Sequence, residues 1–338
     1  MINKKIRFIQ FYTFLILSLL SLSSCHQNPF DIDVEELEID VIRFDKELVT
    51  TSPDSLDEKV MIWDKKYPIF FTMYTRGVLQ VGGVGDRGFV PFLTKFVTNN
   101  ITQETYKDIL KKYASFNDDK KKIEKAFSYY HHYFPKREIP KVFTVISGFN
   151  QSIAMDSMVL AIALDKYLGE KDNFYERLAI PMYLRKKFRR ELIPVDCMRA
   201  IAWGEFPFVG EDNMANNMIY EGKVQYFLEA VLPFVDDSLK MGYTEKQMKW
   251  SYKNEKNIWT AIIEGEMLYQ TKPIQIKNMT KEAPFSQPFG NHSPPKLGVW
   301  IGWQIVRSYM ENNPQVTLKE LMENDDYTAI LNSSSYQP

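Results

Sequence analysis

The sequence predicts a predominantly helical α+β fold with a small β-sheet in the form of a hairpin. Apolar residues recur at three-to-four spacing through most of the chain, which is the period of amphipathic helices. Thr244 with Gln247 and Thr317 with Glu320 have the form of helix capping boxes. Only residues 142–164 contain two β-branched apolar runs joined by turn residues. Helices should therefore dominate the fold.

Residues 1–24 are predicted to be an export signal that is removed from the mature protein. Lys4, Lys5 and Arg7 precede an apolar run at residues 8–22, and small residues lead to Cys25. The run of about 15 residues spans about 22 Å as a helix, whereas the hydrocarbon core of a bilayer is roughly 30 Å thick. A permanent transmembrane helix is therefore not expected.

The residues Leu22, Ser23, Ser24 and Cys25 resemble the lipobox of bacterial lipoproteins. The resemblance implies that Cys25 becomes the first residue and carries fatty acyl chains such as palmitate. Two or more chains anchor a protein stably without spanning the membrane. His26 rather than Asp follows the cysteine, which by the proteobacterial sorting rule implies the outer membrane, and we expect its periplasm-facing leaflet. An ordinary signal peptide with a chance cysteine is the alternative.

The composition argues against nucleic-acid binding and against a disulfide. The formal net charge is −1 and becomes more negative once the basic signal peptide is removed, so no basic field attracts nucleic acid. With Cys25 acylated, Cys197 is the only thiol left in the chain. Because it lies in the apolar stretch 193–206, we expect a buried and inert thiol.

The mature chain is predicted to be a lipidated tether (residues 25–33) followed by one large domain (residues 34–338). Residues 34–44 should be extended and join the sheet. Ser52 and Pro53 start a helix whose buried face would include Leu56, Val60, Trp63 and Tyr67, and another helix follows Pro68. Residues 102–133 should form two helices with a break near Asn117. The chain up to about residue 135 is therefore mostly helical.

The second part of the domain is predicted to begin with a hairpin of residues 142–146 and 158–164. Helices are expected near Pro181, at Pro194, and at residues 213–232, 297–312 and 318–324. A long helix from Thr244 to about Met267 should be a central packing element. Residues 271–295 contain five prolines and should form a long loop.

No motif predicts a catalytic, cofactor or metal site. Gly83, Gly85 and Gly88 spell GxGxxG, but no strand-helix-strand pattern surrounds them, so a surface loop is favoured over a dinucleotide site. His131 and His132 are adjacent and diverge by about 100° on a helix, which prevents them from sharing a metal. An all-carboxylate calcium site stays open, although Asp236 and Asp237 lack regular ligand spacing.

Five basic residues form a cluster with Phe188 inside it, namely Arg185, Lys186, Lys187, Arg189 and Arg190. On a membrane-tethered protein such a patch would meet anionic headgroups or an acidic partner. The alternative is a solvated helix face. Trp300 and Trp303 on a predicted helix indicate a packing cluster rather than a ligand platform.

Several stretches between residues 140 and 314 together resemble the gliding motility-associated lipoprotein GldB family of Bacteroidetes. They are VFTVISGFNQ, ALDKYLG, MIYEGKVQYFLEAVLP, MGYTEKQMKW, NEKNIW and GVWIGWQIVRSYMENNP. The resemblance implies a non-enzymatic envelope component associated with gliding motility and the type IX secretion system. Its partners would be the membrane, through the lipid, and other gliding or secretion proteins.

The family is also distantly similar to predicted zinc peptidases with an HExxH helix, which would imply a zincin-like scaffold lacking its metal. The corresponding positions run from Tyr220 to Val224, so both histidines are absent, while Glu221 stands where the general base would be. Glu255 would be a third-ligand position. A degenerate periplasmic peptidase or hydrolase is the alternative function.

Overall fold

The computed structural model describes residues 28–156 and 158–338. Val34–Pro338 form one unit, and Met1–Asp33 belong to a separate one. The predicted signal peptide and Cys25 lie outside the described residues. Acylation of Cys25 therefore stays a prediction.

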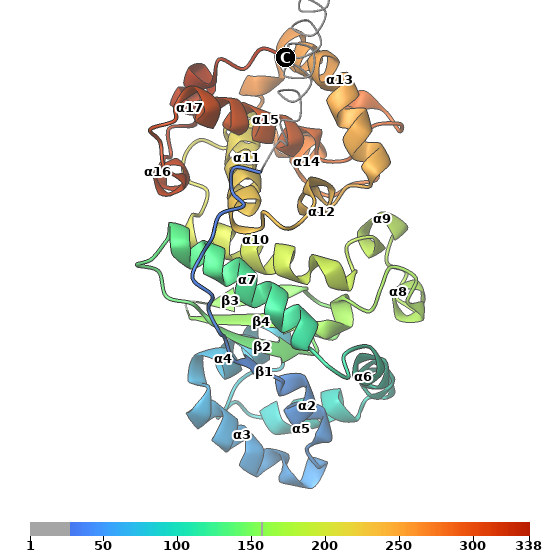
Figure 1. Cartoon of the computed structure of the whole chain (residues 1–338). Helices are drawn as coiled ribbons and strands as arrows, with labels where there is room; N and C mark the ends of the chain where they lie inside the picture. The colour runs from blue at the N-terminus through green and yellow to red at the C-terminus, as the bar shows by residue number, and fades with distance from the viewer. Residues whose placement is uncertain (1–27, 157) are drawn as a thin grey trace, which may run out of the picture. The chain divides into compact units, whose positions relative to one another are not determined.

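Four short strands form one mixed sheet in the order β1-β2-β4-β3 (Figure 1). They are β1 (Val41–Ile42), β2 (Lys141–Val145), β3 (Ile153–Asp156) and β4 (Val159–Ala163). Both β1 and β4 run parallel to β2, and β3 pairs antiparallel with β4. The extended N-terminal segment joins the sheet through β1, as predicted. The predicted class, predominantly helical α+β with a small sheet, is confirmed.

The predicted hairpin of residues 142–146 and 158–164 is wrong. These segments are β2 and β4, which are parallel neighbours, with Phe143 opposite Ala161. The antiparallel partner of β4 is β3, a strand of sequence IAMD that the sequence analysis missed. A short half-buried edge strand has no clear alternation of apolar and polar residues, so its pattern did not predict a strand.

Both faces of the sheet are covered, which explains why β4 is buried at all five residues. Phe143, Val145 and Ala161 point into an aromatic cluster on one face. Helix α10 (Ile193–Glu205) contacts β3 and β4 from the other face, where it also packs on α7 (Asn117–Tyr133) (Figure 1).

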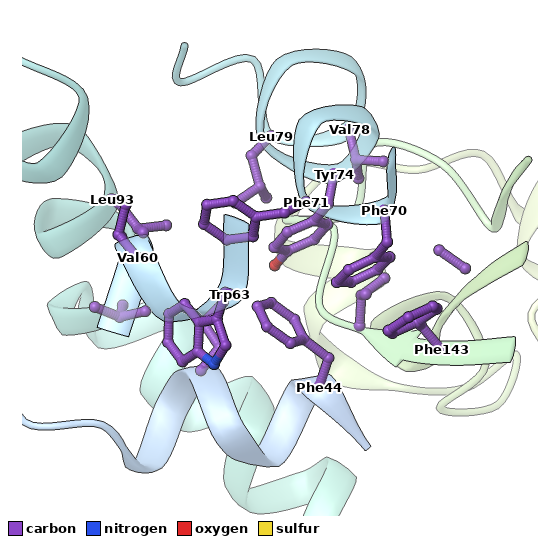
Figure 2. Close-up of a cluster of buried hydrophobic side chains, with 14 of the residues drawn as sticks. Phe44, Val60, Trp63, Phe70, Phe71, Tyr74, Val78, Leu79, Leu93 and Phe143 are labelled. Atoms are coloured by element: carbon purple, nitrogen blue, oxygen red, sulfur yellow. The ribbon is translucent and has the colours of Figure 1, made fainter. Parts of the chain in front are cut away.

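Figure 2 shows the aromatic cluster, which the N-terminal helices build against β2. Its helices are α2 (Phe44–Thr50), α3 (Leu56–Lys66), α4 (Pro68–Thr72), the π-helix Met73–Val78 and α5 (Phe89–Thr98). The ring of Phe44 lies 4.9 Å from that of Phe70 and 5.0 Å from that of Trp63, both edge-on. Edge-on contacts between aromatic rings add to the stabilisation from burial alone.

Of the next five helices, all except α8 (Asn173–Arg177) were predicted. They are α6 (Asn100–Lys112), α7, α8, α9 (Met182–Arg185) and α10. Asn117 begins α7, at the predicted break, and Pro194 lies in the first turn of α10. Proline is tolerated there because first-turn N–H groups have no partner within the helix.

The C-terminal helices are arranged around α11 (Met214–Val231) and α15 (Leu297–Asn312). The others are α12 (Asp237–Met241), α13 (Glu245–Glu264), α14 (Pro273–Thr280), α16 (Leu318–Glu323) and α17 (Tyr327–Ser334). Both predicted capping boxes are present, at Thr244 and Thr317.

Two predictions for this part of the chain are wrong. The helix that begins at Glu245 is peripheral rather than central, since Tyr252 and Ile263 on its apolar stripe are each 46% exposed. The proline-rich segment is not a continuous loop, because α14 begins at Pro273. A proline at the first helical position starts a helix instead of breaking it.

The backbones of α11 and α15 touch where glycines face each other. A β-carbon at Gly302 would lie 1.8 Å from the carbonyl oxygen of Met218, and one at Gly222 would lie 2.3 Å from the carbonyl of Gly302. Any side chain larger than hydrogen would therefore force the two helices apart.

We expect Gly302→Ala to lower the free energy of unfolding by about 3 kcal/mol or more, because an overpacked core must shift its backbone. Urea denaturation measures this change. The matched control is Gly77→Ala, where no atom lies within 4 Å of the added carbon; it should be neutral or stabilise by up to about 1 kcal/mol. Equal unfolding midpoints for both variants would refute the close contact.

Candidate functional site

Helix α11 carries Tyr220, Glu221 and Val224, which the sequence analysis related to a peptidase motif only as an expectation, and each is used in packing. The hydroxyl of Tyr220 donates to the carbonyl of Phe206 at 3.0 Å. Glu221 is 6% exposed and accepts a hydrogen bond from Lys281 Nζ at 3.1 Å. Val224 is fully buried. These side chains join α11 to its neighbours.

Glu255, the proposed third position, lies on α13 and accepts a hydrogen bond from the Tyr336 hydroxyl at 2.8 Å. Its carboxylate thereby connects α13 with the C-terminal segment. Within residues 28–156 and 158–338, no three His, Cys, Asp or Glu side chains gather as a metal site requires.

A lysine is buried on the same helix. Lys223 is 1% exposed, and its Nζ donates to the carbonyl of Asn324 at 2.6 Å, directly after the last residue of α16. The ammonium also lies 5.2 Å from the ring centre of Tyr327. Burial lowers the pKa of Lys223 to about 8, and the nearby Asp325 opposes this only partly. Lys223 holds α16 and α17 against α11.

Two ion-pair groups flank α11 and α15. In the first, Arg307 pairs with Glu229 at 2.8 Å and with Asp237 at 2.7 Å, and Trp303 Nε1 donates to Glu229 at 2.9 Å. Arg307 also lies 3.9 Å from the ring centre of Trp303. Trp303 therefore has a packing role, as predicted, and so does the fully buried Trp300.

The second group has one carboxylate between two lysines. Glu282 lies 2.7 Å from Lys296 Nζ and 3.1 Å from Lys187 Nζ. Burial alone would raise the pKa of Glu282, but the charges of Lys296 and Lys187 outweigh it and hold the pKa at about 2. Glu282 thus fixes the segment before α15 to the basic stretch near residue 187.

The predicted basic cluster is divided among separate contacts. Lys187 pairs with Glu282, Arg189 with Glu191 at 3.2 Å, and Arg190 with Asp119 at 2.5 Å. Arg185 Nε donates to the carbonyl of Ile180, and Lys186 is exposed. Binding of lipid or an acidic partner by these residues stays a prediction.

Sequence reasoning missed a buried carboxylate after β4. Asp165 accepts hydrogen bonds from Ser147 N at 3.0 Å and from Phe149 N at 2.6 Å, so it holds the turn that follows β2. That turn is strained, since Phe149 has a φ of +64°. Burial raises the pKa of Asp165, although these hydrogen bonds act against it.

The signal for this contact was the pair of family-like stretches SGFN and LDK. Each follows a strand, and the carboxyl ends of parallel strands lie at the same edge of a sheet. An antiparallel hairpin of residues 142–146 and 158–164 would place the two stretches at opposite ends of the strand pair. The error in strand direction therefore concealed the Asp165 contact.

A comparison with protein-family models identifies the chain. The model for the gliding motility protein GldB, a lipoprotein family, matches residues 26–338. The chain belongs to the GldB family. No curated protein and no solved structure matches this GldB-family chain at a significant level. Among the described residues, the helices of this family member are too short or too polar to cross a bilayer.

Two further predictions for this GldB-family protein concern the glycines at residues 83–88 and the thiol of Cys197. The glycines Gly83, Gly85 and Gly88 lie in a loop that follows the π-helix rather than a strand, and Arg76 pairs there with Asp86 at 2.8 Å. Cys197 is fully buried, as predicted, and burial raises the pKa of its thiol.

Glu282→Gln should destabilise the protein by about 3 kcal/mol at pH 7, because the buried Lys296 then loses its carboxylate partner. The folded pKa of about 2 lies below the ordinary 4.5, so the contribution of Glu282 is present above pH 4.5 and is lost as pH falls toward 2. Urea unfolding from pH 7 to pH 3 measures it. Glu245→Gln, at a residue whose side chain is 84% exposed, is the control and should change stability little.

Lys223→Met should remove one component of the pH dependence of stability. The folded pKa of about 8 lies below the ordinary 10.5, so the penalty for burying the charge is complete below pH 8 and disappears as pH rises to 10.5. The stability difference between variant and wild type should therefore change across this window. If the stability difference between the variant and the wild type stayed the same from pH 7.5 to 10.5, the burial of a charged Lys223 would be contradicted. Lys253→Met, at an exposed residue, is the control.

Proposed function

We propose that this GldB-family protein is a lipid-anchored, non-enzymatic component of the cell envelope. In this proposal it acts by binding other proteins of the gliding and type IX secretion machinery. The family match over residues 26–338 supports the association with gliding motility. The lipobox-like residues before Cys25 support a lipid anchor, and His26 in place of Asp after the cysteine supports the outer membrane, where we expect the periplasm-facing leaflet.

The proposal that the protein is not an enzyme rests on one observation: helix α11 is packed in the core of the domain. Where the distantly similar peptidases would hold a metal, Tyr220 and Val224 pack inside the protein and Glu221 is paired with Lys281. Next to them, Gly222 brings α11 into backbone contact with α15. This part of the helix thus supports the domain, which leaves the outer surface for interactions.

The second candidate is a periplasmic peptidase or hydrolase, favoured by the retained Glu221. The Lys281 side chain that pairs with Glu221 is 54% exposed, so solvent reaches one side of this ion pair. Stoichiometric zinc in the purified native protein would support this candidate.

The test is affinity purification of the crosslinked, full-length lipoprotein from its own envelope, with metal content measured on the same sample. We expect gliding or secretion components without stoichiometric zinc. Cys25→Ala should give an uncleaved or soluble form and lose these components, since a protein without its acyl chains leaves the membrane. Recovery of zinc and of no envelope protein would overturn the proposal. If the Cys25→Ala form supported gliding or secretion as fully as the wild type, the lipid anchor would not be needed.

A further inference from the structure

An apolar pocket of about 220 Å³ opens at the surface beside the aromatic cluster. Phe70 and Phe143 line it, and their rings lie face to face in Figure 2. The two ring centres are 3.7 Å apart. Tyr67 stands edge-on to both rings, at 6.3 Å and 5.2 Å. The pocket is therefore lined by rings that are fixed by their neighbours.

Its rim exposes large apolar side chains that the fold does not cover. Ile69 is 47% exposed and Met158 is 37% exposed, and both line the pocket with Pro68 and Val159. Single exposed apolar residues are common, but several around one concave site mark a binding surface.

The charges at this pocket are all positive. Lys66 and Lys141 line it, no carboxylate does, and neither lysine forms an ion pair with any part of the chain that the structure describes. The Lys66 ammonium lies 4.8 Å from the ring centre of Tyr67. A ligand for this pocket would therefore combine an apolar group with a carboxylate.

A groove of about 590 Å³ adjoins the pocket and shares Tyr67, Ile139 and Lys141 with it. Its other wall is the extended segment of residues 37–42. Helix α7 fixes this wall, because Ser128 Oγ accepts from Leu37 N at 2.9 Å and Glu124 accepts from Ile39 N at 3.1 Å. A groove with an extended segment as one wall, beside a small pocket, suits an extended chain.

We propose that the pocket and groove bind an extended segment of a partner protein. The segment inserts an apolar side chain between Ile69 and Met158 and places a neighbouring carboxylate against Lys66 and Lys141. Glu38 and Asp40 line only the groove, so the partner's carboxylate must lie at the pocket, near Lys66 and Lys141. A uniformly anionic lipid surface would meet both acids and be repelled, whereas a polypeptide can place its single carboxylate at the lysines. This inference rests on the proposed function, since it specifies where the partner binds.

The test places a photo-crosslinking phenylalanine analogue at position 69 of the full-length lipoprotein in its native envelope. We expect a crosslink to one polypeptide, in a segment where an apolar residue adjoins Asp or Glu. The same analogue at Ile274, which is 64% exposed on α14, is the control and should not give this product.

Lys66→Glu with Lys141→Glu should reduce the crosslink at least about tenfold, because like charges then face the partner's carboxylate. Lys65→Glu, at the neighbouring exposed residue that does not line the pocket, should leave it unchanged. Equal urea midpoints for the variants would show that they fold.

Crosslinks to lipid, equal products at positions 69 and 274, or no effect of the double charge reversal would each overturn the inference. Affinity purification of the doubly charge-reversed protein separates the two proposals. If gliding or secretion components are still recovered, only the pocket assignment fails. If wild type recovers none, the proposed function itself fails.

Discussion

The backbone contact between α11 and α15 is the constraint on which the C-terminal part of the domain depends. Gly222 and Gly302 let the two helices approach until the carbonyl of Met218 occupies the space where a side chain would stand. At this separation the helices exclude water along their shared face. The surrounding short helices then pack against one rigid pair instead of against each other.

Charged side chains connect this close pair of helices to each other and to their neighbours. Lys223, Glu229 and Arg307 each connect α11 or α15 to a neighbouring element. Buried charges are costly unless they are paired, so each of these contacts specifies one arrangement of its helix.

In the N-terminal part of the domain, the sheet is the element against which the helices pack. With helices on both faces, β2 and β4 contribute Phe143 and Ala161 to the aromatic cluster and bring the turn at Ser147 next to Asp165. At one surface of the cluster, Phe70 and Phe143 line a pocket with a positive rim. The same rings thus stabilise the core and form the proposed partner site.

The amino-acid sequence by itself determined most helices, because spacing, capping residues and prolines act within a few residues of one another. Thr244 and Thr317 form the predicted caps, and Asn117 begins the predicted helix. The thiol of Cys197 is buried as its apolar neighbours indicated. The family could also be identified from short sequence stretches, since they occur in the family's order.

Strand direction, the central helix pair and the surface sites were decided only by the tertiary structure. Two apolar runs look the same whether they pair parallel or antiparallel, so the contact of Asp165 with Ser147 could not be inferred. Similarly, α13 has the stronger apolar stripe, but glycines determine that α11 and α15 form the centre. The pocket at Ile69 joins residues from distant parts of the chain, and sequence spacing carries no information about such distances.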